Sequence, residues 1–197
     1  MQLELDYFDD TLLNTEKGMN ILVLGDKKSG KSTLVKTIVK KMNKIFKNGN
    51  VCTDSNHYNN VYSEFLDIEN IYKRYSTLIS KRCFINNYYL ILDDYYYSKN
   101  SYNEVFSKIK SVNMNLVIGI GRLTDFKDYC YIFICRFTNK KELEKVYKYY
   151  IDKLNIFNEL QDFINFVNLT TTDYDTVVIN VLTTIKEKIF TFYNSIE

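Results

Sequence analysis

Short apolar runs alternate along the chain with longer segments in which apolar residues recur at helical spacing. The apolar runs, each of a length typical of a buried strand, lie at residues 20–24, 51–53, 88–92, 116–120, 129–137 and 176–181. Helical spacing occupies residues 31–46, 65–79, 102–109, 143–150 and 156–167, and we expect a closing helix after the last strand. This alternation predicts an α/β fold, a three-layer sandwich around a largely parallel sheet, in a single domain over residues 1–197.

The rhythm changes between the strands predicted at 116–120 and 129–137. Only about eight residues separate them, fewer than the roughly twelve that a helical crossover needs. We therefore expect these two strands to be joined antiparallel or by a tight excursion of the chain. Either way, the sheet is predicted to carry an antiparallel addition.

Composition narrows the range of functions. Hydrophobic residues make up 46% of the chain and charged residues 25%, which is typical of a globular protein, and the formal net charge of +2 gives no bulk attraction to nucleic acid or membranes. No apolar run approaches the roughly 18 residues of a membrane span, and the acidic start MQLELDYFDD lacks the features of a signal peptide. We expect a cytoplasmic protein without a membrane partner, whose contacts with DNA, if any, are local.

The strongest chemical signal is the segment GDKKSGKS at residues 25–32, here called the P-loop. It fits the pattern GxxxxGK[ST] between an apolar run and an amphipathic helix. Such a loop turns backbone N–H groups inward, and the helix N-terminus adds its dipole, so the segment predicts a phosphate site. Lys31 is expected to reach the β- and γ-phosphates and the Ser32 hydroxyl to ligate Mg²⁺. The other expected nucleotide-binding residues are Gly25, Lys28, Ser29, Gly30 and Thr33.

A second acidic site is expected because Mg²⁺ in such proteins is usually also held, through water, by a carboxylate at the end of a neighbouring buried strand. The segment YLILDD at residues 89–94 supplies one. Asp93 ends the apolar run and is assigned to the water shell of the metal, and Asp94 is assigned to polarising the attacking water as general base. The alternative for this pair is a solvated acidic turn. Together with the P-loop, the pair predicts an NTPase.

Two segments resemble small GTPases: ILVLGDKKSGKS, and NKKE at residues 139–142, which is similar to their guanine-reading NKxD motif. Glu142 stands where an Asp would accept protons from guanine, and DDYY at residues 93–96 replaces their DxxG motif. The alternative for NKKE is a helix start, with Thr138 as N-cap and Glu142 near the first turn. These departures favour ATP over GTP as the nucleotide.

The order of the elements resembles that of the poxvirus-type genome-packaging ATPases of the FtsK/HerA class. The resemblance covers about residues 18–185 and rests on GDKKSGKS, on LILDD and on element order. It implies an ATPase that assembles into a homo-oligomeric ring and translocates double-stranded DNA, with capsid proteins as further partners, in the host cytoplasm or the virion. In this family a polar sensor, often Gln, ends the strand after the acidic pair, where this chain has Ile120-Gly121-Arg122.

The resemblance also implies that an arginine from a neighbouring subunit completes each active site. An arginine that stabilises charge on a transferring γ-phosphoryl group increases the rate strongly. Arg122 and Arg136 are the candidates, because both lie at ends of predicted strands, and surface ion pairing is the alternative role for each. For the whole chain, the alternative is a degenerate P-loop protein that acts as a scaffold or as a small-GTPase-like switch.

Overall fold

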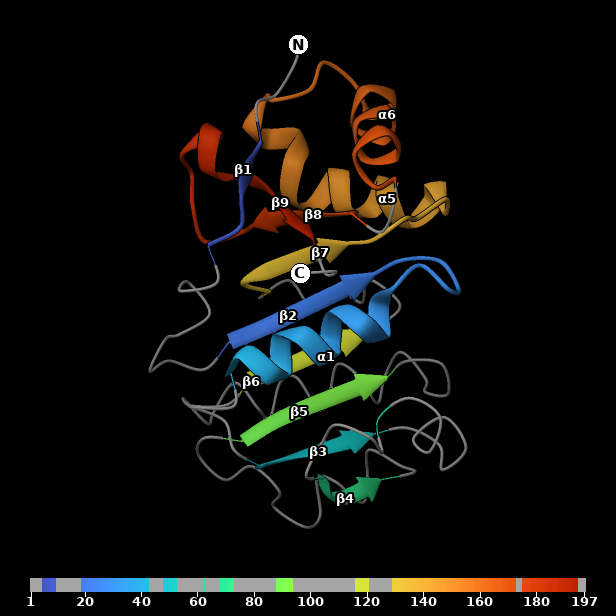
Figure 1. The fold of residues 1–197 in the computed structure, drawn as a ribbon. Coiled ribbons are helices and arrows are strands. Elements are labelled where there is room, and N and C mark those ends of the chain that lie inside the picture. Colours follow the sequence, from blue (N-terminus) through green and yellow to red (C-terminus); the bar gives the residue numbers. More distant parts are fainter. Residues whose placement is uncertain are drawn as a thin grey trace.

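The computed structural model describes residues 5–9, 19–42, 48–52, 62, 68–72, 88–93, 116–120, 129–172 and 175–194 (Figure 1). Its strands are β1 (Asp6–Tyr7), β2 (Met19–Leu24), β3 (Asn48–Cys52), β4 (Ile68–Tyr72), β5 (Tyr88–Asp93), β6 (Leu116–Ile120), β7 (Tyr131–Ile134), β8 (Asp175–Asn180) and β9 (Phe190–Asn194). Its helices are α1 (Lys31–Met42), α5 (Lys140–Val146), the π-helical turn η3 (Tyr147–Ile151), the 3₁₀ turn η4 (Asp152–Leu154), α6 (Leu160–Thr170) and the 3₁₀ turn η5 (Lys186–Lys188).

All the strands belong to one sheet, in the order β1-β9-β8-β7-β2-β6-β5-β3-β4. Among the described strands, β8 is antiparallel to both of its neighbours, and the other pairs are parallel. The predicted α/β fold, a largely parallel sheet with an antiparallel addition, is therefore confirmed. Parallel strands end at a common edge, so the carboxyl ends of β2, β5, β6 and β7 lie along one side of the molecule.

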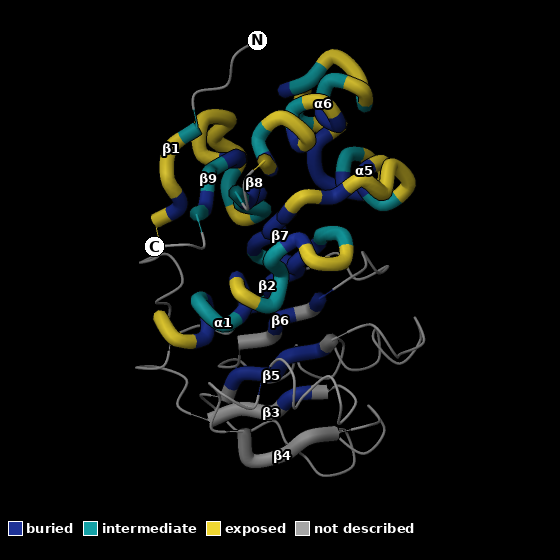
Figure 2. Tube along the Cα trace, turned by 45° about the vertical axis from the view of Figure 1, so that its right-hand side comes forward, coloured by how far each residue is buried: buried dark blue, intermediate teal, exposed yellow. Residues whose placement is uncertain are grey.

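Alternating side chains of β2 explain the three layers. Leu22 and Leu24 belong to the apolar cluster that includes the buried residues of α5 and α6, whereas Ile21 and Val23 belong to the cluster that includes those of α1. Successive side chains of a strand point to opposite faces, so helices on both faces require a central strand that is apolar throughout. Figure 2 shows the result: β2 lies between the helical layers, and all its residues are buried except the half-buried Asn20.

The position of β2 corrects one expectation. The strands β6 and β7 both pair with β2 and run parallel to it, so they are neither adjacent nor antiparallel to each other. Ile21, for example, is in register with Ile118 on one side and with Tyr131 on the other. The minimum of roughly twelve residues applies to a helical crossover, whereas extended chain covers about 3.3–3.6 Å per residue and can return over a short strand with fewer.

Two predicted helices are wrong. Residues 68–72, inside the helix predicted at 65–79, form β4, which pairs with β3. The closing helix is replaced by η5 and the strand β9, which pairs with β8 and β1. Both segments are rich in Ile, Tyr and Phe, which favour strands when a sheet edge is available for pairing. The helix predicted at 102–109 lies outside the described residues.

The helical layer after β7 matches the prediction for residues 143–150 and 156–167. Leu143 and Val146 of α5 and Phe163 and Val167 of α6 are buried in the apolar cluster beside β7 and β8. Their spacing of three or four residues places each pair on one face of its helix. No helix in the described part of the chain combines the length and the apolar character needed to cross a lipid bilayer.

Candidate nucleotide-binding site

The P-loop connects the central strand β2 to α1 in an unusual backbone conformation. Lys28 has φ 65° and Gly30 has φ 91°, both in the left-handed region, while Ser29 between them does not. Alternation of the two hands turns successive N–H groups toward one side and forms an anion-binding concavity. A non-glycine residue held in the left-handed region costs on the order of 1 kcal/mol or more, and such strain is typical of functional loops.

Gly25 allows the P-loop to close tightly on itself. A Cβ atom at this position would overlap Ser29 Oγ and lie 3.0 Å from Cys135 Cβ and 3.2 Å from Lys31 Cγ. Glycine is the residue that fits here without displacing these neighbours. Ser29 is buried, and its N–H donates to the carbonyl oxygen of Asp26 at 3.3 Å, so this residue contributes to the closed form of the loop.

Lys31, the first residue of α1, bends back over the loop. Its Nζ donates hydrogen bonds to the carbonyl oxygen of Gly25 at 2.9 Å and to that of Asp26 at 2.5 Å. A phosphate oxygen is a stronger partner for an ammonium group than a carbonyl oxygen is. The lysine is thus close to the concavity and held by bonds that a phosphate group would replace.

The first turn of α1 carries the other predicted P-loop residues. Leu34 N donates to Gly30 O at 2.9 Å, which closes the first turn of the helix. Ser32 is half-buried beside the loop, and Thr33 is exposed, with its carbonyl accepting a hydrogen bond from Thr37 Oγ1 at 3.1 Å. The helix N-terminus therefore faces the loop, where its dipole favours an anion.

A second chain segment, the β7 turn (residues 135–139), forms the wall beside the P-loop. Cys135 N donates to Leu24 O at 2.9 Å, and Asp26 N donates to Arg136 O at 2.9 Å, so the pairing of β2 with β7 continues beyond both strands. Asp26 Oδ2 also accepts hydrogen bonds from Thr138 N at 2.9 Å and from Thr138 Oγ1 at 2.7 Å. The sequence predicted no role for Asp26 and only a helix cap for Thr138, because a separation of 112 residues hides their contact from local patterns.

Cys135 forms the floor beneath the P-loop and is buried. Burial raises the pKa of its thiol, while the hydroxyl of Thr176 and the positive charge of Lys31 lower that pKa in part. The thiol is therefore neutral at physiological pH and does not compete with a phosphate group for the lysine.

Asp93 is the last residue of β5 and lies on the same edge of the sheet as the P-loop. From the sequence we expected this carboxylate on a strand next to β2, but β6 lies between β2 and β5. Asp93 is in register with Ile120 of β6, and Ile120 is in register with Val23 of β2. Two strand spacings of about 4.8 Å separate the backbones of β2 and β5. This strand order places the end of β6, where a sensor was expected, between Asp93 and the P-loop.

The residue types at this edge, a serine hydroxyl and an aspartate, are ones that would suit Mg²⁺. No cluster of three or more His, Cys, Asp or Glu residues occurs among the described residues. Mg²⁺ usually keeps several waters and binds through one or two carboxylates and the phosphates of its substrate, so it needs no such cluster. Ser32 and Asp93 are the residues that would hold it, and the bound ion would neutralise charge on the phosphates.

The remaining predicted catalytic residues differ in what the structure shows of them. Asp94 and Arg122 lie outside the described residues. Arg136 is exposed in the β7 turn, and its guanidinium makes no hydrogen bond or ion pair within the described part of the chain. Its carbonyl oxygen accepts a hydrogen bond from Asp26 N in the P-loop, and its side chain extends into solvent.

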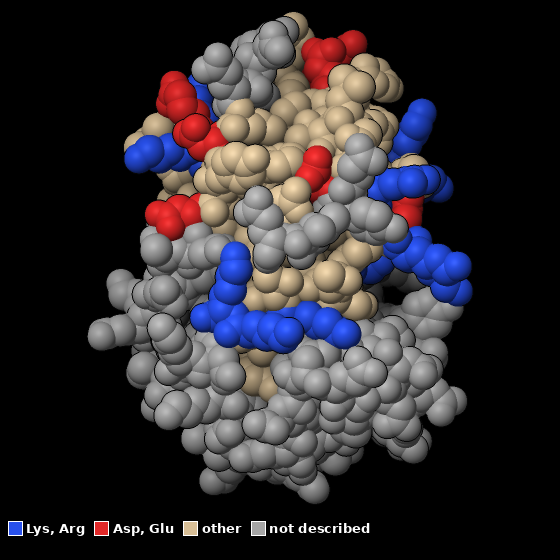
Figure 3. Space-filling view, in the orientation of Figure 1, with Lys and Arg blue, Asp and Glu red and all other residues tan. Residues whose placement is uncertain are grey.

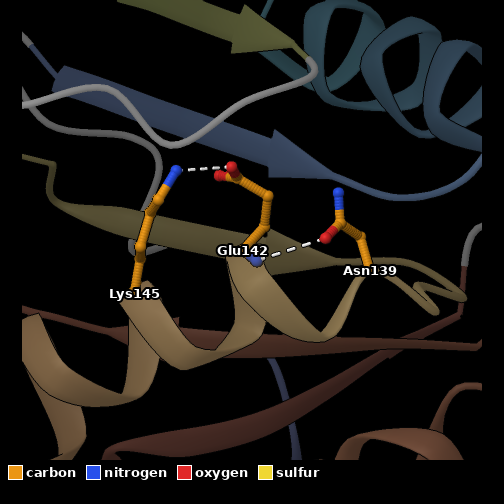
Figure 4. A network of polar contacts seen from close by, with 3 residues as sticks. All are labelled: Asn139, Glu142 and Lys145. Carbon is orange, nitrogen blue, oxygen red and sulfur yellow. Dashed lines mark hydrogen bonds and ion pairs between the residues drawn. The ribbon is translucent and has the colours of Figure 1, made fainter.

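The NKKE segment begins a helix, as the second interpretation of this motif predicted. Figure 4 shows Asn139 Oδ1 accepting a hydrogen bond from Glu142 N at 3.4 Å and Glu142 paired with Lys145 at 2.6 Å. The cap is Asn139 and not Thr138, because the Thr138 hydroxyl is bonded to Asp26. The side chains that a guanine base would need are thus occupied within α5.

Positive charge surrounds the P-loop and α1. Residues 27–41 contain six lysines, and α1 itself contains no acidic residue; the lysines are Lys27, Lys28, Lys31, Lys36, Lys40 and Lys41.

Figure 3 shows basic side chains across the middle of one face, over α1, and acidic side chains mostly above them. A cleft or face lined by one sign of charge raises the local concentration of ligands of the opposite sign. The surroundings of the P-loop thus favour an anionic ligand.

Comparison with solved structures gives matches over about nine-tenths of this chain. The genome packaging NTPase B204 from Sulfolobus turreted icosahedral virus 2, in complex with ATP-gammaS, has 17% sequence identity and a TM-score of 0.60, with 90% of this chain and 97% of that chain covered. Its complex with sulfate has 19% identity, a TM-score of 0.59 and coverages of 93% and 98%. This chain has the P-loop NTPase fold.

A further match is B204, the DNA-packaging ATPase from Sulfolobus turreted icosahedral virus, with 16% identity, a TM-score of 0.59 and coverages of 91% and 98%. No protein-family model and no curated protein matches the sequence. At identities below 20% these structures support the fold alone, and a function for this chain has to be argued from its own residues.

Proposed function

We propose that this protein is a Mg²⁺-dependent ATPase that drives translocation of double-stranded DNA during the packaging of a viral genome. The observation that carries the proposal is the P-loop geometry. Left-handed residues at Lys28 and Gly30 open the loop, and Lys31 lies across it on carbonyl groups that a phosphate would displace. These features are suited to a nucleoside triphosphate, whose negative charge the lysine, the backbone N–H groups and the helix dipole would stabilise.

The packaging role is supported by similarity over the whole fold. The matched structures are those of a genome packaging NTPase and a DNA-packaging ATPase, and the similarity extends over about nine-tenths of this chain. A shared P-loop alone would align only the first strand and helix. We therefore assign ATP as the nucleotide and duplex DNA as the polymer that is moved.

The proposal includes a ring in which a neighbour supplies an arginine. Arg136 is exposed at the edge of the sheet that carries the P-loop, and Arg122 comes two residues after β6 in the sequence. A guanidinium at the γ-phosphate stabilises the charge that develops during transfer and is worth about 10³–10⁵ in rate in NTPases. Asp94 is proposed as the residue that orients the attacking water.

Turnover by the full chain tests the proposal. We expect hydrolysis of ATP in preference to GTP, stimulation by linear double-stranded DNA, and turnover per subunit that rises with protein concentration. Binding of a fluorescent ATP analogue without any turnover would instead support the scaffold alternative. Turnover that depends neither on DNA nor on protein concentration would reject the ring motor and leave a self-sufficient ATPase.

Subunit mixing tests the shared site. Arg136→Ala or Arg122→Ala is expected to retain ATP binding and lose hydrolysis, and mixing either variant with Lys31→Ala subunits is expected to restore part of the activity. Each mixed interface can combine an intact P-loop with an intact arginine. Absence of any restoration would assign the arginine to the same subunit as the P-loop that it serves.

A further inference from the structure

Asp26 occupies a variable position of the P-loop, yet it is hydrogen-bonded to the β7 turn through both its backbone and its side chain. Its N–H donates to Arg136 O at 2.9 Å, and its carboxylate accepts from both the N–H and the hydroxyl of Thr138, at 2.9 and 2.7 Å. Its own carbonyl accepts from Lys31 Nζ. One residue thus joins the P-loop lysine to the turn that carries Arg136.

These bonds fix the backbone around Arg136 on both sides. On one side, Cys135 N is bonded to Leu24 O, and on the other, Thr138 is held through two donors by the carboxylate of Asp26. Hydrogen bonds to a charged acceptor are shorter and roughly twice as strong as those between neutral groups. The Arg136 side chain therefore extends from a backbone segment whose distance from the P-loop is set by Asp26.

The pairing with Thr138 also solves an electrostatic problem. A carboxylate in the P-loop would repel the phosphate groups that the loop binds, unless its charge were directed elsewhere. Two donors from Thr138 bind the same oxygen, Oδ2, and draw the charge toward the β7 turn. An acidic residue is thereby compatible with phosphate binding at this position, and it accepts hydrogen bonds from Thr138 that an apolar residue could not accept.

We propose that Asp26 is a positioning residue, which holds the β7 turn against the P-loop so that Arg136 keeps a fixed distance from the bound nucleotide. The inference rests on the proposed ATPase function and names a residue that acts through another one. A displacement of about 1 Å in a catalytic group can cost on the order of a hundredfold in rate, so such a support is expected to affect turnover more than binding.

Single variants separate this role from a merely structural one. Asp26→Ala is expected to lower kcat about tenfold while the Kd for a fluorescent ATP analogue stays within about twofold or becomes tighter, because the carboxylate that repels phosphate is gone. Asp26→Asn keeps an oxygen acceptor for Thr138 and is expected to recover most of kcat. Thr138→Val keeps the N–H donor but lacks the hydroxyl, and its kcat is expected to fall about threefold. Thr138→Ser retains the hydroxyl and is expected to keep the kcat of the wild type.

The deciding measurement is a double-mutant cycle on kcat. If Asp26 acts through Arg136, then Asp26→Ala has little further effect in an Arg136→Ala background, and the double variant is within about twofold of Arg136→Ala alone. If the losses in kcat of the two single variants multiply in the double variant, the proposal is overturned. An Arg136→Ala variant with normal turnover would also overturn it. Thr184→Val, an exposed threonine on the β8–β9 connection, is the matched control and is expected to behave as the wild type.

Failure of the inference can be told apart from failure of the proposed function. Wild-type protein without ATP hydrolysis overturns both. Wild-type hydrolysis that Lys31→Ala abolishes, together with an Asp26→Ala variant that keeps its kcat, overturns the role of Asp26 alone. Thermal unfolding is measured for each variant, and if Asp26→Ala does not fold, the cycle is run with Thr138→Val, whose result supports or overturns the same coupling to Arg136.

Discussion

Two strand–turn–helix units lie side by side at the centre of this protein and differ in what their turns can bind. The units are β2–P-loop–α1 and β7–turn–α5, their strands are parallel neighbours, and their turns meet at one edge of the sheet. Their helices cover opposite faces. A lysine begins each helix, Lys31 in α1 and Lys140 in α5.

The residue before each helix accounts for the difference. Asn139 precedes α5 and caps it with its own side chain, so an N–H group of the first turn is already bonded. Gly30 precedes α1 and has no side chain with which to cap it, and its left-handed backbone opens the loop. A strand–turn–helix unit is therefore not in itself a phosphate site: the first N–H groups of the helix have to remain available to a ligand.

The largest difference in ATP hydrolysis is expected between substitutions of the lysines that begin the two helices. Lys31→Ala should reduce ATP hydrolysis by at least about a hundredfold, since Lys31 would contact the β- and γ-phosphates. Lys140→Ala is the matched control and should leave hydrolysis unchanged, because the cap of α5 leaves this turn without an anion site. Steady-state turnover of both variants checks the prediction, which equal losses would contradict.

A smaller effect is expected from closing the P-loop sterically. Gly25→Ala places a Cβ atom against Ser29 Oγ and 3.0 Å from Cys135 Cβ, so the loop must widen, and ATP affinity should fall about tenfold. Titration with a fluorescent ATP analogue measures this loss of affinity. Adding Ser29→Ala removes the overlapping hydroxyl and should restore part of the affinity; a Gly25→Ala variant with normal affinity would show that the loop adapts without cost.

The cap of α5 should matter for stability and not for the nucleotide. Asn139→Ala removes the cap and should lower the free energy of unfolding by about 1 kcal/mol, while Asn139→Ser should retain most of it. The ratio of ATP to GTP binding should be the same in both variants. Denaturant unfolding and competition binding test these points, and a changed base preference would revive the guanine-reading interpretation of NKKE.

The smallest effect is expected at Glu142. Its bond to Lys145 is an exposed pair three residues apart on a helix, which contributes only about 0.2–0.5 kcal/mol. Glu142→Gln should therefore change stability by no more than this and leave nucleotide preference unaltered. The same unfolding and competition assays apply, and a selective loss of GTP binding is the result that would contradict it.

Local signals predicted the P-loop well and distant contacts poorly. GDKKSGKS is contiguous, and its flanking strand and helix follow from apolar spacing within a few residues. β4 and β9 were mistaken for helices because the partners that stabilise them as strands, β3 and β8, are invisible in the local pattern.

The candidate site shows the same limit. The pattern LILDD indicated that Asp93 ends a buried strand, but not that β6 separates this strand from β2. The contact of Asp26 with Thr138 joins segments 112 residues apart, and no periodicity or motif announces it. Turn chemistry at residues 138–142 predicted a helix start, yet the choice of Asn139 over Thr138 as its cap depended on that distant contact.

The pairing of β2 with β7 has a consequence for the newly made chain. At a synthesis rate of about 5–20 residues per second, the segment after β7 emerges roughly 5–20 s after the P-loop has been made, given the 112 residues between Asp26 and Thr138. Until then the P-loop lacks the partners of Asp26, and the central strand lacks one of its two neighbours. Contacts so distant in sequence form slowly. The nucleotide site thus forms late in folding, because the P-loop cannot make its contacts with the β7 turn before the chain has been synthesised through Thr138.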